Sequence, residues 1–113
     1  MNVVVIMGRL SRPSEERTLE SGARLMTLQV TVDGPTGAET VPIVCFDPPA
    51  AVSGLDIGET VAIRGRVRRR FFRAGGATQS RTEVVADAVI PARRRTAVES
   101  LLTEAAVRLR PER

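Results

Sequence analysis

The sequence contains no histidine, no lysine, no tryptophan and no tyrosine, and it has a single cysteine, Cys45. Without histidine, thiol–imidazole pairs, Ser-His-Asp triads and histidine-rich metal sites cannot be built. One cysteine cannot form an intrachain disulfide, so the sequence predicts a cytoplasmic protein. No apolar run approaches the roughly 18 residues that a membrane helix needs. These absences exclude most classes of enzyme, and we expect no catalytic residue, no metal and no cofactor.

The basic residues, all 17 of them arginine, are unevenly placed along the 113-residue chain. Residues 1–63 carry 4 arginines and 8 acids, whereas residues 64–113 carry 13 arginines and 5 acids. The isoelectric point is near 11.1. Positive charge concentrated in one half of a chain favours a polyanionic partner. A solubilising surface is the alternative that charge alone leaves open.

Short segments rich in β-branched residues recur along the chain. The segments expected to form strands are 2–10, 25–32, 41–46, 60–72 and 81–89. Gly8 indicates a bulge or a close backbone approach in the first of them. Residues 11–24 and 33–40 are polar and rich in turn-forming residues, and they are expected to be connections.

A helix of about two turns is expected over residues 50–56, between the third and fourth strands. Five strands at short spacing favour a small barrel, because a sandwich usually needs about seven. Thr96 and Glu99 have the spacing of a capping box, which predicts a helix over residues 97–109. Its apolar stripe consists of Val98, Leu101, Leu102, Ala105 and Leu109. Such a short helix is marginal alone, and we expect it to contact another subunit or a protein partner rather than its own barrel.

The segment 64–73 holds six arginines in ten residues and no acid. Alternate residues of a strand share a face, so one face carries a row of guanidinium groups that ends in a ring: Arg64, Arg66, Arg68, Arg70 and Phe72. The opposite face is expected to lie in the core: Val61, Ile63, Val67 and Phe71. Guanidinium groups bind phosphates, and aromatic rings stack on bases of any sequence. Because no acid lies in the segment to pair with the row, the pattern predicts a site for single-stranded nucleic acid. A solvated strand face that discourages edge pairing is the alternative.

Four pieces of the sequence follow one another in a characteristic order: 1–11, 21–23 together with 28–32, 58–67 and 82–89. In this order they resemble the bacterial single-stranded DNA-binding proteins, over residues 1 to about 91. The resemblance implies a mainly β, five-stranded OB-fold barrel that forms a homo-oligomer, with a tetramer favoured over a dimer. It also implies sequence-independent binding of single-stranded DNA in replication, recombination or repair, in association with the nucleoid.

Carried over by position, Phe46 and Phe72 match aromatic residues on which this family stacks bases, although Phe46 taken alone fits the core better. Thr40 falls where many members carry a tryptophan. The candidate DNA-binding residues are therefore Arg64, Arg66, Arg68, Arg70, Phe72, Phe46, Arg9 and Arg73. Residues 1–91 are expected to form the binding domain. Residues 92–113 are expected to form a basic linker and an amphipathic helix, in place of the acidic tail of the family.

Two further functions stay open at this point. An OB-fold protein-interaction module would resemble the primosomal replication proteins, which share the fold, lack the acidic tail and bridge protein partners. An RNA-binding OB-fold protein would differ only in its ligand. An enzyme is disfavoured, because titratable catalytic groups are missing.

Overall fold

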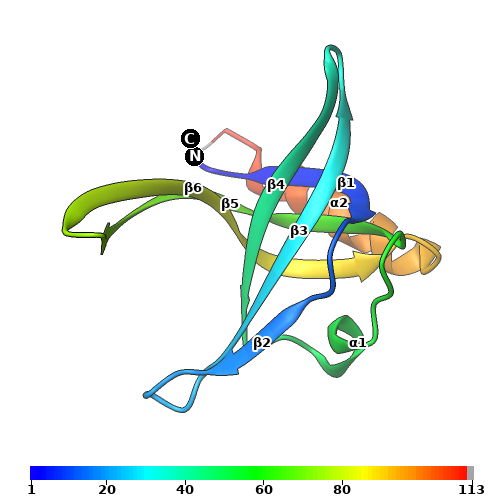
Figure 1. Ribbon diagram of the computed structural model, residues 1–113. Helices are drawn as coiled ribbons and strands as arrows, with labels where there is room; N and C mark the ends of the chain where they lie inside the picture. The colour runs from blue at the N-terminus through cyan, green and yellow to red at the C-terminus, as the bar shows by residue number, and fades with distance from the viewer. Residues whose placement is uncertain (112–113) are drawn as a thin grey trace.

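The computed structural model describes residues 1–111, which form six strands and two helices (Figure 1). In chain order these are β1 Val4–Leu10, β2 Glu15–Thr18, β3 Arg24–Gly34, β4 Gly37–Phe46, α1 Ala50–Ser53, β5 Thr60–Ala74, β6 Ala77–Pro91 and α2 Arg95–Arg108. The protein is mainly β, as the alternation of apolar residues predicted.

The strands of the described chain join one sheet in the order β1-β5-β6-β4-β3-β2, and a further pairing between β1 and β3 closes it. The closing contact is short, with Arg9 opposite Thr31 and Leu10 opposite Val30. Paired strands run antiparallel except β4 and β6, which are parallel where residues 43–45 meet residues 84–86. A closed sheet of this order is consistent with the expected OB-fold, with one strand more than the five expected.

Gly8 lies where β1 crosses β3, and it has no room for a side chain. A Cβ atom at this position would lie 2.5 Å from the backbone oxygen of Thr31 and 2.7 Å from a side-chain carbon of Val30. The predicted close approach of the backbone at Gly8 is therefore confirmed. It allows β1 to pair with β5 and then, at its end, with β3, which closes the sheet.

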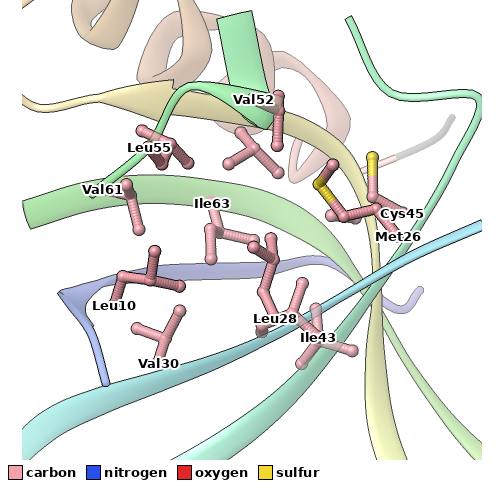
Figure 2. Close-up of a cluster of buried hydrophobic side chains, with 13 residues drawn as sticks. Leu10, Met26, Leu28, Val30, Ile43, Cys45, Val52, Leu55, Val61 and Ile63 are labelled. Atoms are coloured by element: carbon pink, nitrogen blue, oxygen red, sulfur yellow. The ribbon is translucent and has the colours of Figure 1, made fainter. Parts of the chain in front are cut away.

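The core lies inside the closed sheet (Figure 2). It consists of Leu10, Met26, Leu28, Val30, Ile43, Cys45, Val52, Leu55, Val61, Ile63, Val84, Ala86 and Val89. In place of the two helical turns expected over residues 50–56, α1 is a single turn. Its Val52 is nevertheless 1% exposed, so this turn covers part of the core.

Two segments expected as connections contain strands. Residues 15–18 pair with β3 as β2, although all four of them are exposed. A strand without a buried face has no apolar alternation, so the pattern could not predict it. Likewise, β3 and β4 stay paired as far as Gly34 and Gly37, which leaves only Pro35 and Thr36 as the turn.

The hairpin of β5 and β6 extends away from the closed sheet, in a different direction from the hairpin of β3 and β4 (Figure 1). Strand β1 pairs with β5 only as far as Gly65, and β4 pairs with β6 only over residues 84–86. Farther out, β5 and β6 pair only with each other among the described strands, up to Ala74 and Ala77. We call this outer part, residues 68–83, the ribbon.

Helix α2 packs on the outer face of β5 and β6 of its own chain. The contact is a second apolar cluster made of Ala62, Val98 and Leu101, with Ala88 and Ile90 beside it. Two buried residues of the stripe, Val98 and Leu101, therefore pack on the sheet of their own chain, contrary to the expectation for these two residues. The small side chains of Ala62 and Ala88 leave room for the helix to approach the sheet. Leu102 and Leu109, expected in the same stripe, stay 48% and 50% exposed.

The predicted capping box does not form. Helix α2 begins at Arg95, with Arg94 as its N-cap residue and no side-chain cap hydrogen bond. The basic linker before it is held as a turn, because Arg94 N donates to Pro91 O at 3.0 Å and Arg93 pairs with Glu59 at 2.9 Å.

Candidate nucleic-acid interface

The arginine row of β5 lies on the outer face of the sheet, as predicted. Residues paired across two antiparallel strands share a face, and Arg66, Arg68 and Arg70 lie opposite Val85, Glu83 and Arg81 of β6. The register shifts between Arg64 and Gly65, but the extra residue is in β6, so the alternation of β5 continues unbroken.

The prediction for the opposite face of β5 is only partly right. Val61 and Ile63 are 1% and 0% exposed, as expected for core residues. Val67 and Phe71 are 42% and 67% exposed, so their assignment to the core is wrong. Their parity is that of the core, but they lie beyond the end of the core, and no other element within residues 1–111 covers them.

Arg64 does not belong to the accessible row. Its guanidinium lies under α2, where Nε is 2.7 Å from Asp87 Oδ1 and Nη1 is 3.2 Å from Glu104 Oε2. Nη1 also donates to the backbone oxygen of Leu101 at 3.4 Å. With the residue 8% exposed, these contacts anchor α2 to the sheet, and the expected contact of Arg64 with nucleic acid is not available.

Asp87 is the extra residue of β6 at the register shift, and its carboxylate takes part in the contacts that hold α2 on the sheet. Arg108, in the last turn of α2, donates to Asp87 Oδ2 at 2.6 Å. Burial alone would raise the pKa of Asp87, but the hydrogen bonds and charges of Arg108 and Arg64 outweigh it and hold this pKa below its ordinary value.

A buried carboxylate lies directly beneath the rest of the row. Glu83 is 2% exposed, and its two oxygens accept from Arg68 Nη2 at 3.2 Å and from Arg70 Nε at 3.0 Å. The expectation that the row has no acid to pair with is therefore wrong, because the partner comes from the neighbouring strand. Arg68 Nε is also buried, without a hydrogen-bond partner among the described residues.

Each of these two arginines lies over a phenylalanine ring. The guanidinium carbon of Arg68 is 5.8 Å from the ring centre of Phe46, and that of Arg70 is 5.2 Å from the ring centre of Phe72. Both separations are within cation–π range. Phe46, the last residue of β4, is 42% exposed. Glu83 thus holds two arginine–phenylalanine pairs on one face of the sheet.

A groove of about 420 Å³ adjoins these pairs. Its floor includes Thr27 and Gln29 of β3 and Pro42 and Val44 of β4, and it is bounded by the segment 12–17 and by the ribbon. Four of the lining residues are cations: Arg12, Arg17, Arg70 and Arg81. Three are acids: Glu15, Glu16 and Glu83. Two of these acids are engaged within the protein, since Glu83 holds Arg68 and Arg70, and Glu16 pairs with Arg24.

Residues 1–91 match the Single-strand binding protein family. The chain belongs to this family. No curated protein matches the sequence. Membership of the single-strand binding protein family supports the binding of single-stranded DNA without catalysis, and proteins of this family typically form oligomers. The resemblance to this family that the order of the sequence segments indicated is confirmed.

The remaining candidate residues of this single-strand binding protein lie in separate places. Arg66 is exposed and makes no ion pair within residues 1–111. Arg73 donates to the backbone oxygen of Gly76 at 3.1 Å, at the tip of the ribbon. Arg9 pairs with Asp33 at 3.4 Å, toward the C-terminal end of β3. Phe46 is paired with the opposite, N-terminal end of the same strand.

Arg12, Arg17 and Arg81 line the groove but were missed by the sequence reasoning. Arg17 lies in β2 and Arg12 lies just before it. No apolar alternation predicts this strand, and acidic residues lie between the two arginines. A signal for Arg81 existed, because strand pairing of the segments 60–72 and 81–89 places it near the arginine row. Within residues 1–111, no helix is long and apolar enough to cross a membrane, and His, Cys, Asp and Glu form no cluster suited to a metal.

Proposed function

We propose that this protein binds single-stranded DNA without sequence preference along the groove and the two arginine–phenylalanine pairs. The observation that carries the proposal is the placement of Phe46 and Phe72 on one sheet face, each under an arginine held by Glu83. Bases would stack at these rings, while Arg66, Arg70 and Arg81 would contact phosphates.

The chemistry favours a single strand over a duplex. Stacking on a side chain requires a base whose face is open, and paired bases in a duplex have both faces covered. An aromatic ring accepts any base, so recognition of this kind is tolerant of sequence.

The charge of the groove supports a polyanionic ligand. Arg70 lies directly opposite Arg81 in the register of β5 and β6, and like charges in such pairs are destabilising. Glu83 compensates Arg70, which leaves a net positive charge at this point. A phosphate placed between the strands and the segment 12–17 would relieve the repulsion.

The test is fluorescence anisotropy with labelled single-stranded DNA, duplex DNA and RNA of equal length, at low salt. We expect the tightest binding for single-stranded DNA and markedly weaker binding for the duplex. Tighter binding of RNA would make the ligand RNA and overturn the DNA preference. Binding to none of the three would overturn the proposal and favour a protein-interaction module.

The interaction module remains the second candidate because α2 keeps an apolar surface. Leu102, Val107 and Leu109 are 48%, 53% and 50% exposed, which is where a protein partner would dock. We also propose a homo-oligomer, with a tetramer favoured, acting on the nucleoid in DNA replication, recombination or repair. Light scattering of the purified protein tests the oligomeric state.

A further inference from the structure

The ribbon has a second face that carries its own aromatic ring. Phe71 is 67% exposed, and the guanidinium carbon of Arg69 lies 5.9 Å from its ring centre. Neighbouring residues of a strand point to opposite faces, so this ring and that of Phe72 lie on opposite sides of the ribbon. The pair of Arg69 and Phe71 repeats, on the second face, the pair of Arg70 and Phe72 on the first.

The chemistry around Phe71 suits a nucleic acid. In the cross-strand register, Arg69, Phe71 and Arg73 lie opposite Thr82, Ser80 and Thr78. All three β6 residues are exposed, and their hydroxyl groups can donate hydrogen bonds to phosphate oxygens. No acidic residue lies on this face between positions 67–73 and 78–84. The second face therefore lacks the internal carboxylate that Glu83 supplies on the first.

We propose that Phe71, Arg69 and Arg73 form a second stacking site for single-stranded nucleic acid, so that a strand leaving the groove passes around the ribbon and is held on both of its faces. This inference rests on the proposed function, since the strand reaches the second face from the groove. The ribbon is only two strands wide, about 5 Å between backbones, and no other strand of the described chain pairs with residues 68–83. An exposed ring on such a ribbon gains nothing for the fold.

Anisotropy with labelled oligo(dT) of graded length tests the second site. OB-fold sites span about 4 to 16 nucleotides, so a short oligomer reaches one face and a long one reaches both. We expect Phe71→Ala to raise the dissociation constant for long oligomers about fivefold or more and to change that for the shortest very little. Phe72→Ala is expected to weaken the binding of both.

Two matched variants control for loss of bulk. Phe71→Tyr keeps the aromatic ring and is expected to bind long oligomers as the unchanged protein does. Val67→Ala removes apolar surface from the same face, where Val67 is 42% exposed, and is expected to leave binding unchanged. Thermal melts establish that each variant is folded.

The outcomes separate this inference from the proposed function. If Phe72→Ala weakens binding and Phe71→Ala has no effect at any length, the second face is not a binding site, while the groove remains one. If the unchanged protein binds no oligo(dT), both proposals fail. If Phe71→Ala changes the mass seen by light scattering but not binding, this face is a contact between copies of the chain and the second site is overturned. Photo-crosslinks of thymine to Phe71 would support it independently.

Discussion

Arg68 and Glu83 face each other across β5 and β6, and Arg68 Nη2 lies 3.2 Å from a carboxylate oxygen that is almost sealed from water. The same carboxylate also accepts a hydrogen bond from Arg70 Nε at 3.0 Å. A buried acid with two cations fixes both guanidinium groups over their rings before any ligand arrives. Side chains already ordered lose less conformational entropy on binding.

Replacing this acid tests how much it stabilises the fold. Glu83→Gln should lower the free energy of unfolding by about 1.5–3 kcal/mol, because charge-assisted hydrogen bonds contribute about that much. Chemical denaturation measures the change. The matched control is Glu99→Gln on the exposed side of α2, for which we expect about 0.5 kcal/mol or less. Equal effects of the two substitutions would mean that Glu83 contributes no more than a surface residue.

The salt dependence of DNA binding distinguishes the buried arginine from the accessible ones. Four engaged arginines would give a slope of log affinity against log salt of about −3, whereas the three proposed phosphate contacts, Arg66, Arg70 and Arg81, would give about −2. Replacing Arg66 with Gln should reduce the slope by about 0.7. Arg64→Gln should leave the slope unchanged, provided that circular dichroism shows the variant to be folded. A loss of slope at Arg64 would contradict its assignment to the α2 anchor.

An added ring at position 40 should strengthen binding. Thr40 is exposed on β4 and has the same parity as Phe46, so Thr40→Trp extends the stacking surface along the strand. We expect tighter binding of oligo(dT) by about 1–3 kcal/mol. The sequence has no other tryptophan, so quenching of its fluorescence reports contact directly. Thr103→Trp on α2 is the control, and quenching there equal to that at position 40 would argue against the groove.

The Asp87 anchor makes stability depend on pH in acid. Its pKa is lowered in the folded protein, so the unfolded chain binds its proton more readily. The contribution of Asp87 is therefore fully present above the ordinary pKa of about 3.9 and is lost as pH falls below it. The decline in unfolding midpoint between neutral pH and pH about 3 should be smaller in Asp87→Asn. A decline of the same size in both proteins would show that the anchor does not titrate.

Two adjacent leucines test how α2 is attached. Leu101 is 3% exposed against the sheet, whereas Leu102 is 48% exposed on the other side of the helix. Leu101→Ala should destabilise the monomer by about 2–4 kcal/mol through the cavity it leaves. Leu102→Ala should cost about 0.5 kcal/mol or less. The reverse order, measured by thermal melts with light scattering, would mean that α2 docks on another subunit.

The order and type of the core strands were determined by the sequence itself. Alternation over residues 25–32 is enough to place β3, because one of its faces is buried along the closed sheet. Gly8 could be singled out because a crossing of two backbones leaves no space for a Cβ atom. The parity of the arginine row also followed from the sequence, since a strand that keeps its alternation keeps its faces.

Burial and partners were decided only by the tertiary structure. Strand β2 forms through backbone pairing with β3. Its side chains are all exposed, so their sequence pattern does not indicate a strand. Phe71 has the parity of the core but lies beyond the point where the core ends, a position that depends on where β1 and β4 stop. Arg64 and Arg66 are alike in sequence, yet the helix that covers one of them comes from more than thirty positions away. Glu83 meets the row only because β6 returns beside β5, and such contacts between distant segments are set by packing rather than by local spacing.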